Sequence, residues 1–350
     1  MNAFTAIIGY PLGWVMWLLY NAVSNYGVAL LLFTLFARLV IVPTSIKQQK
    51  STAKMAMLRP QQDELTKKYK GNKKKLNEEI MNLYKKEGYN PMSGCLPLLI
   101  QFPILFGIID VIYKPLTHIL RIEADIIDQL TAITTSMGEF NVRAMSSVEL
   151  MVLRAVNEIP EAFSSIDPDI LLIVQNFVPK MRFLGMDLME TPNTAMFTQI
   201  FTVFNPVLFV PVLSGLTSLM FSFMSLKTTA AASAGQPGAA NMKVMMMMMP
   251  VFSVWITFSF PAGIGLYWIY SNMVGVVQSF VLNKIYNPKE MAEKYRKESE
   301  EKKERERLER IEAKKKAKES GGYDESASRR LAEARRRDAE KYGEAYDEAD

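Results

Sequence analysis

The chain is poor in the residues that build most reactive centres. Its 350 residues contain one cysteine, Cys95, and one histidine, His118. A single thiol excludes an intramolecular disulfide, and one Cys with one His cannot supply the ligands of a zinc or iron–sulfur site. A catalytic triad would also need a base and an orienting group beside its nucleophile. The sequence therefore predicts a protein that is not an enzyme and that uses neither a metal nor another cofactor.

Charge is missing from the beginning of the chain, where the first charged residue is Arg38. The apolar stretch over residues 4–20 is short for a membrane span and is interrupted by Pro11, so we expect residues 1–22 to form an interfacial amphipathic helix. Its aromatic side chains are of the types that sit at headgroup level: Tyr10, Trp14, Trp17 and Tyr20. A sixth span over residues 4–20 is the alternative.

Long apolar runs make up much of the rest, and 49% of the chain is hydrophobic. A helix of about 20 apolar residues crosses a hydrocarbon core of about 30 Å. Five segments approach that length: 23–43, 95–113, 204–224, 244–258 and 264–282. Pro261 and Gly263 lie between the last two and predict a tight turn, so these spans should form an antiparallel hairpin.

The distribution of charge predicts the orientation of these spans. Segment 44–94 has 12 Lys/Arg against 5 Asp/Glu, whereas 114–197 has 6 against 11. Lys and Arg are enriched on the cytoplasmic side of membranes. We therefore expect 44–94, 225–243 and the tail 284–350 inside, and 114–203 outside, with the N-terminal end outside.

Segment 44–94 has the pattern of a helical hairpin, with apolar residues at helical spacing before and after the turn signal Gly71-Asn72. Its lysines are candidates for docking an acidic or RNA-bearing partner: Lys67, Lys68, Lys73, Lys74 and Lys75. Contact with anionic lipid headgroups explains them equally well. In the tail, residues 290–318 alternate in sign as a solvated helix does.

Polar residues inside the predicted spans suggest an interhelical surface open to the cytoplasm. Arg38 lies about 7 Å from the inner end of its span, at about 1.5 Å per residue, and either faces this surface or extends to the headgroups. Gln101 lies in the inner half of the second span, and Asn272 lies on the fifth span near the aromatic residue Trp268. Asp110, near an outer end, should meet water or Lys114 at i+4.

Five collinear motifs resemble the YidC/Oxa/Alb family of membrane protein insertases. They are Asn25-Tyr26-Gly27 leading through Arg38 to Pro43; Lys50-Ser51 with Lys54-Met55, Pro60 and Lys68-Tyr69-Lys70; Leu83-Tyr84-Lys85 with Asn90-Pro91 and Gly94-Cys95-Leu96-Pro97; Gln101-Phe102-Pro103-Ile104; and Phe260-Pro261-Ala262-Gly263 with Leu266-Tyr267-Trp268 and Ser271-Asn272. The resemblance covers about residues 10–285 and is to the five-span, Gram-positive-type form.

The resemblance implies an all-α membrane protein of the bacterial plasma membrane: a bundle of five transmembrane helices with a cytoplasmic helical hairpin and an N-terminal interfacial helix. It also implies a hydrophilic groove, open to the cytoplasm and to lipid, that contains Arg38, Gln101, Trp268 and Asn272. Expected partners are nascent membrane proteins, lipids, and the ribosome through the hairpin and tail. The Sec translocon and the signal recognition particle receptor are further candidates.

Two features depart from this resemblance. The outer loop is longer than expected, with an added helix predicted between Ala144 and Ile159, and Asp110 matches no motif. The serious alternative is a membrane-anchored, ribosome-binding scaffold, which would explain the basic segments and would not need Arg38.

Overall fold

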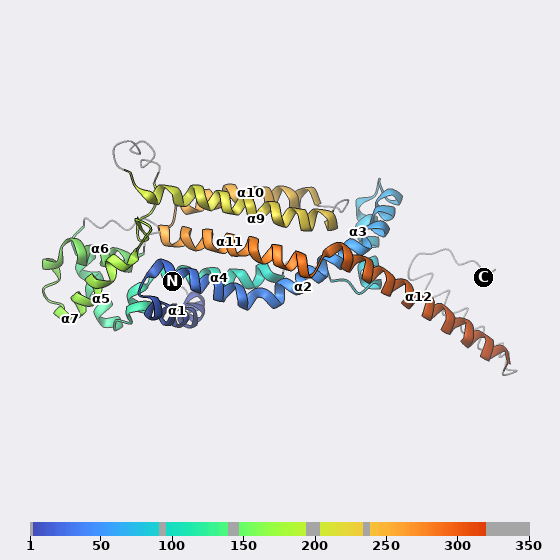
Figure 1. Cartoon of the computed structure of the whole chain (residues 1–350), viewed down its shortest axis with the longest axis horizontal. Coiled ribbons are helices and arrows are strands. Elements are labelled where there is room, and N and C mark those ends of the chain that lie inside the picture. Colours follow the sequence, from blue (N-terminus) through green and yellow to red (C-terminus); the bar gives the residue numbers. More distant parts are fainter. Residues whose placement is uncertain (1–2, 91–95, 139–146, 194–203, 234–238, 320–350) are drawn as a thin grey trace. The chain divides into compact units, whose positions relative to one another are not determined.

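The computed structural model describes residues 3–90, 96–138, 147–193, 204–233 and 239–319 (Figure 1). These residues are almost entirely helical, which confirms the all-α class. Among them the only β structure is a two-residue pair, β1 (Arg182–Phe183) antiparallel to β2 (Met186–Asp187). The chain forms two compact units, Met1–Ala292 and Glu293–Asp350, and the helical bundle lies within the first.

One long helix, α2 (Tyr26–Lys68), passes through the predicted boundary at residue 43 without a break. Asn25 caps its start by accepting a hydrogen bond from the Val28 backbone N–H at 3.1 Å. Its 43 residues reach about 65 Å at about 1.5 Å per residue, roughly twice the hydrocarbon thickness. The sequence changes from apolar to polar within the helix, so the predicted boundary at residue 43 marks a change of composition and not the end of a helix.

Three helices of the second half form a layer in which α9 is central. α9 (Phe209–Ser233) packs against both α10 (Ala239–Thr257) and α11 (Ala262–Ile285), as Figure 1 shows. α10 and α11 are joined by a short turn, but they meet mainly where Gly265 approaches Thr257 beside that turn. The predicted α10–α11 hairpin pairing is therefore wrong, because α9 packs against both helices.

Small and hydroxyl residues explain why α9 takes this central position. Ser214 on α9 and Ser253 on α10 share a hydrogen bond of 2.6 Å between their Oγ atoms, and both are buried. A side chain at Gly215 would overlap Val254 of α10. Small residues let two helix backbones approach closely, and serine hydroxyls join them where water is absent.

The first helix, α1 (Ala3–Val23), packs along α4 (Leu96–Tyr113). Gly107 of α4 faces Ile8 and Leu12 of α1. Gly9 and Gly13 of α1 lie against Asp110 and His118. The exposed side of α1 is apolar: Ile7, Tyr10, Trp14 and Leu18. This apolar stripe suits contact with lipid.

The segment that follows α4 forms a group of short helices. After α4 come a π-helical turn, η2 (Leu116–Leu120), and the helices α5 (Ala124–Ser136), α6 (Val148–Glu158), η3 (Pro160–Phe163), α7 (Pro168–Phe177) and η4 (Val178–Met181). The helix predicted between residues 144 and 159 is confirmed as α6. Its residues Val152, Leu153, Ala155 and Val156 are fully buried and continue the main hydrophobic core.

A second, separate core joins the polar half of α2 to α3 (Lys73–Lys86). Leu58, Leu76, Ile80, Tyr84 and Tyr89 are buried in it, and Leu65 and Tyr69 pack against it. Asn72 caps α3 by accepting from the Lys75 N–H at 3.0 Å. This core is small, and lysines surround it on the exposed side of both helices.

Two described helices are long and apolar enough to cross a membrane, the one at Tyr26–Lys68 and the one at Pro206–Leu226, which joins η5 (Pro206–Leu208) to α9. Shorter apolar helices cover Ile7–Val23, Ile100–Tyr113 and Met246–Thr257. The last described helix, α12 (Pro288–Glu319), is highly charged and has ion pairs at i,i+4, as between Arg296 and Glu300.

Candidate functional site

The guanidinium of Arg38 turns toward α11. Its Nη2 donates to the Ser271 backbone carbonyl at 2.6 Å and to the Ser271 hydroxyl at 2.7 Å. The Phe221 ring of α9 lies 5.9 Å from the Arg38 Cζ atom. None of the described carboxylates lies within ion-pair distance of Arg38. A full positive charge among apolar helices is thus held by a carbonyl, a hydroxyl and an aromatic face only.

Polar side chains of α11 lead from Arg38 toward α4. The Gln101 side-chain amide donates to the Tyr267 hydroxyl at 3.2 Å, and Tyr267 lies four residues before Ser271 on α11. Tyr267 is buried, whereas Gln101 and Arg38 are partly exposed. The structure therefore brings two predicted residues, Arg38 and Gln101, to opposite ends of one polar path across α2, α11 and α4.

On the other side of α11 the path approaches α9. Asn272 is buried, and its Nδ2 donates to Thr217 Oγ1 at 3.4 Å. Gly275 makes room nearby, because a Cβ there would lie 3.2 Å from Arg38 Nη2 and 2.9 Å from the Phe221 ring. We call Arg38, Gln101, Thr217, Tyr267, Ser271 and Asn272 the interhelical polar cluster.

Trp268 has a different environment from the other predicted site residues. It is partly buried, and its described contacts are with the main hydrophobic core. Thr217, Phe221 and Gly275 belong to the site but were not predicted. Gly275 was the available signal, since a glycine between valines is unusual inside an apolar helix.

Further side-chain contacts join α2 to α11 beyond this cluster, and their partners are 233 or 234 residues apart in sequence. The Gln278 side chain donates to Ser45 Oγ at 3.0 Å. Gln49, which is buried, donates to the Asn283 side chain and to the Tyr286 carbonyl. Arg38–Ser271 and Ser45–Gln278 are both separated by 233 residues. The partners advance together along both helices, so α2 and α11 run parallel here.

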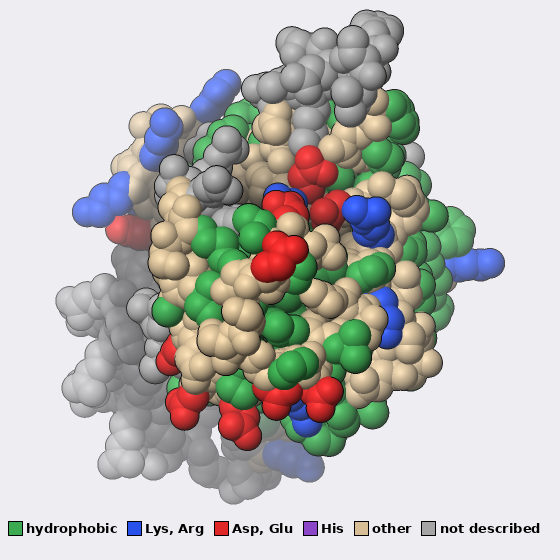
Figure 2. All heavy atoms as spheres, turned by 90° about the vertical axis from the view of Figure 1, so that its left-hand side faces the viewer, with side chains coloured by type: hydrophobic (Ala, Val, Ile, Leu, Met, Phe, Trp, Pro, Cys, Tyr) green, Lys and Arg blue, Asp and Glu red, His purple; other side chains and the backbone are tan. Residues whose placement is uncertain are grey.

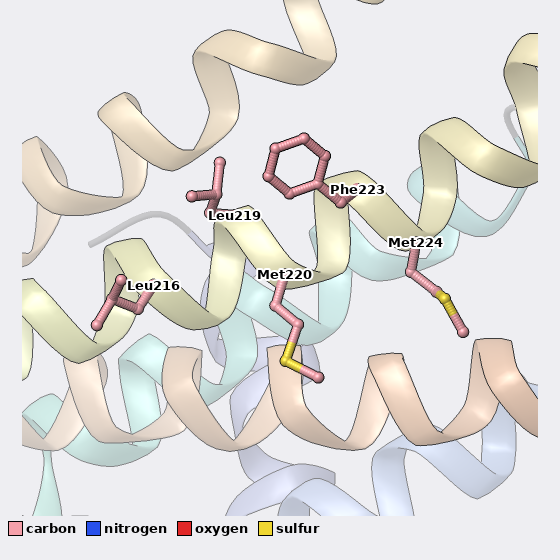
Figure 3. A pocket seen from close by; sticks show the side chains of 5 residues that line it. All are labelled: Leu216, Leu219, Met220, Phe223 and Met224. Carbon is pink, nitrogen blue, oxygen red and sulfur yellow. The ribbon is translucent and has the colours of Figure 1, made fainter.

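An apolar hollow of about 390 Å³ lies on α9. Figure 3 shows the side chains that line it. Its lining residues all come from α9: Leu216, Leu219, Met220, Phe223 and Met224. The methionines have flexible, polarizable side chains that adapt to different apolar shapes. The neighbouring Met247, Met248 and Met249 of α10 are also exposed.

Asp110 lies near the outer end of α4 and is almost fully buried at 1% exposure. Lys114 Nζ lies 3.1 Å from one carboxylate oxygen, which confirms that predicted contact. His118 Nε2 lies 2.9 Å from the other oxygen. The contact with His118 was not predicted, and it forms because Pro115 and the π-turn η2 bring His118 back toward α4. We call these three residues the outer charged cluster.

The remaining predicted site residues are the lysines of the α2–α3 pair. Lys67, Lys68, Lys73, Lys74 and Lys75 are all exposed. The Tyr69 ring lies 5.5 Å from the ammonium groups of both Lys68 and Lys75, so it gathers two of these charges at the turn. Among the described residues, no three His, Cys, Asp or Glu side chains come together as metal ligands would.

An arginine, amides and hydroxyls held between long apolar helices define a membrane protein with a polar surface inside its bundle. The chain matches the family model described as 60Kd inner membrane protein over residues 18–291. It therefore belongs to this family, which is the YidC/Oxa/Alb family indicated by its motifs.

Several relatives of this chain are named membrane protein insertases. The Membrane protein insertase YidC of Clostridium perfringens is 28% identical over 294 residues, which are 84% of this chain and 93% of that protein. The protein of the same name from Treponema denticola is 29% identical over 81% of this chain and 38% of its own length. Membrane protein insertase YidC 2 of Bacillus anthracis is 26% identical over 74% of this chain and 72% of its own length. The chain thus spans less than half of some relatives and nearly all of another.

Proposed function

We propose that this chain is a membrane protein insertase that passes polar segments of new membrane proteins across part of the bilayer through the interhelical polar cluster. The observation that carries the proposal is the Arg38 guanidinium, which no described carboxylate neutralises. Such a charge in a membrane helix costs about 2.5–3.5 kcal/mol at the helix centre on insertion scales. An acidic client segment that pairs with Arg38 would recover part of that cost.

The cluster and the hollow on α9 would act on different parts of a client. Arg38, Gln101 and Asn272 present hydrogen-bonding groups, so they shorten the apolar path that a translocated polar tail must cross. The hollow beside Leu216 and Phe223 would receive the apolar helix of the client. Transfer of that helix into lipid is favourable by about 0.3–0.6 kcal/mol for each Leu, Ile, Phe or Val at its centre. This partitioning supplies the driving force without a nucleotide.

For the topology, we propose five spans at the predicted segments, formed by the first part of α2 and by α4, α9, α10 and α11. The lysine-rich α2–α3 pair and the tail then lie in the cytoplasm of a bacterium, and the acidic segment α5–α7 lies outside. The exposed lysines around Tyr69 suit a ribosome, or the Sec translocon or signal recognition particle receptor, as a docking partner. Trp268 would support the cluster by packing behind it.

The test is insertion by the full-length protein in proteoliposomes of a single-span client with two acidic residues in a short translocated tail. We expect Arg38→Ala to reduce insertion about tenfold, which corresponds to about 1.4 kcal/mol. Insertion of a client whose acids are replaced by amides should be reduced less by Arg38→Ala. Arg59→Ala is the matched control, since Arg59 lies on the same helix and pairs with Asp63 at 3.9 Å.

Photocrosslinking separates this proposal from the scaffold alternative. A crosslinker at Gln101 should reach the client, and the adducts should shift as a stalled nascent chain lengthens. The same probe at Trp268 tests whether clients reach the side of α11 that packs against the core. A ribosome that stays bound without adducts at either position, together with unchanged insertion by Arg38→Ala, would overturn the insertase mechanism and favour a scaffold.

A further inference from the structure

Arg121 occupies an unusual position at the outer end of the bundle. It follows the π-helical turn η2 as its C-cap, with a positive φ of 54°. Left-handed backbone is uncommon for a residue with a side chain, and glycine or asparagine is the usual choice at such a position. An arginine there points to a requirement for its side chain, which is exposed.

The guanidinium of Arg121 lies against two indole rings of α1. Its Cζ atom is 3.9 Å from the centroid of the Trp17 ring and 5.1 Å from that of Trp14. The two indoles are themselves 5.4 Å apart and tilted by 54°. Guanidinium groups are attracted to the faces of tryptophan within about 6 Å, and two such faces fix the plane of the group.

This guanidinium has no acidic partner among the described residues. The Asp110 carboxylate of the outer charged cluster is engaged by Lys114 and His118. Other exposed acids of this segment, such as Asp125 and Asp169, belong to the α5–α7 domain, whose end face in Figure 2 displays scattered acidic side chains. The hydrogen-bond donors of Arg121 therefore remain available to a ligand.

The surroundings of Arg121 indicate which ligand it takes. Trp14 contacts Arg121 and is also 58% exposed within the apolar stripe formed by Ile7, Tyr10, Trp14 and Leu18. Under the proposed topology, this stripe faces the acyl chains of the outer leaflet and Arg121 lies at its headgroup boundary. Tryptophan concentrates at that depth, and arginine binds phosphate through two parallel hydrogen bonds.

We propose that Arg121, held between Trp14 and Trp17, binds the phosphate of an anionic phospholipid in the outer leaflet. The lipid phosphate would sit against the guanidinium while its acyl chains cover the apolar stripe of α1. This site would fix the depth of α1, and through α1 the position of the outer charged cluster beneath it. The inference rests on the proposed topology, which places residue 121 outside.

The site can be tested by native mass spectrometry of the full-length protein titrated with phosphatidylglycerol in detergent. We expect Arg121→Gln to weaken retention of this lipid at least fivefold. Arg121→Lys keeps the charge without the planar stacking, so it should give an intermediate loss. Lys180→Gln is the matched control because Lys180 is an exposed cation of the same segment with no ring contact among the described residues.

Three results would overturn the site. Equal loss in Arg121→Gln and Lys180→Gln would show diffuse attraction to charge. Competition by soluble glycerophosphoglycerol at the lipid's own concentration would show a free-anion site. Unchanged retention in Arg121→Gln, with an unchanged melting temperature, would show no role for the residue.

Insertion assays on the same variants keep this inference separate from the proposed function. Arg121→Gln should insert acidic clients as the wild type does in lipid-rich vesicles, whereas Arg38→Ala should not. Placing the anionic lipid in only one leaflet of proteoliposomes then tests the topology. If Arg121 binds the anionic lipid only when that lipid is in the inner leaflet, the proposed orientation is refuted and the site remains intact.

Discussion

At the scale of single residues, two glycines of α1 allow charges to be buried beside an apolar helix. A side chain at Gly9 would overlap the carboxylate of Asp110, and one at Gly13 would overlap the His118 ring. Tyr10 also places its ring edge-on to His118, with centroids 5.5 Å apart. The glycines thus let α1 cover the outer charged cluster, whose charges would otherwise face lipid at high cost.

We predict that Gly9→Val destabilises the protein by about 1–3 kcal/mol, since overpacking at a tight contact costs that much and here also displaces a buried ion pair. The measurement is thermal unfolding in detergent, where the variant should melt several degrees lower. Gly71→Ala is the control because a Cβ at Gly71 meets nothing within 4 Å. Equal melting of Gly9→Val and wild type would contradict the described packing of α1 on α4.

The same residues show what the sequence could and could not predict at this scale. Lys114 lies four residues after Asp110, so helical spacing alone indicated their contact. His118 is eight residues away, about 12 Å along a straight helix, and reaches Asp110 only because the chain turns at Pro115 and winds into η2. No local pattern in the sequence encodes that π-helical turn.

At the scale of elements, α6 carries a buried acid that makes the outer domain sensitive to pH. Glu149 accepts hydrogen bonds from the Thr117 backbone N–H at 3.0 Å and from its hydroxyl at 2.6 Å. Burial raises the pKa of the Glu149 carboxyl, and the bonds from Thr117 oppose this only in part. The folded state therefore binds a proton more tightly than the unfolded state does.

The sign of the resulting pH dependence follows from linkage. As pH rises from about 4.3, the unfolded pKa of glutamate, toward the raised folded pKa, the unfolded state loses its proton first and stability falls. We predict that Glu149→Gln removes this fall in melting temperature above about pH 4.3, and that the control Glu158→Gln, at an exposed position, keeps it. A pH profile of Glu149→Gln that matches wild type would show that Glu149 ionises as freely when folded as when unfolded.

A disulfide can test the central position of α9. In a Cys95→Ser background, we predict that Ser214→Cys with Ser253→Cys crosslinks readily on mild oxidation, because the two native hydroxyl oxygens lie 2.6 Å apart. The control pair is Ser218→Cys with Ser253→Cys, one helical turn away on the same buried face of α9. Equal crosslinking of both pairs would mean that α9 and α10 slide past each other.

The position of α9 also marks a limit of sequence analysis at the element scale. Apolar runs and turn residues predicted the helices of α9, α10 and α11 to within a few residues, except where α9 and α10 extend toward each other beyond their apolar runs. They did not predict which helices pair, because pairing depends on small residues such as Gly215 and Gly265 that fit against a side chain of the neighbour. Chain order alone favoured the α10–α11 hairpin.

At the scale of the whole molecule, composition divides the long helix α2 between two environments. Its first half is apolar except for Arg38, and its second half holds the lysines that lie with α3 around a separate small core. One continuous helix therefore connects the interhelical polar cluster to the proposed docking surface. Two further polar contacts, Ser45–Gln278 and Gln49–Asn283, hold α2 against α11 beyond the cluster.

The proposed orientation makes a prediction for cysteine labelling in intact cells with a membrane-impermeant maleimide. In the Cys95→Ser background, Glu123→Cys should react from outside, whereas Lys73→Cys and Glu300→Cys should react only after the membrane is opened. The reason is the excess of Lys and Arg in 44–94 against the excess of acids in 114–197.

A fourth position in the same experiment decides how α1 meets the membrane. If α1 stays in the outer leaflet, Asn2→Cys should not react from the cytoplasmic side. Reaction of Asn2→Cys from the cytoplasm alone would make α1 a sixth span, and the other three positions would keep their sides. Reaction of Glu123→Cys from the cytoplasm would instead reverse the whole orientation, and the lipid site at Arg121 would then face the inner leaflet.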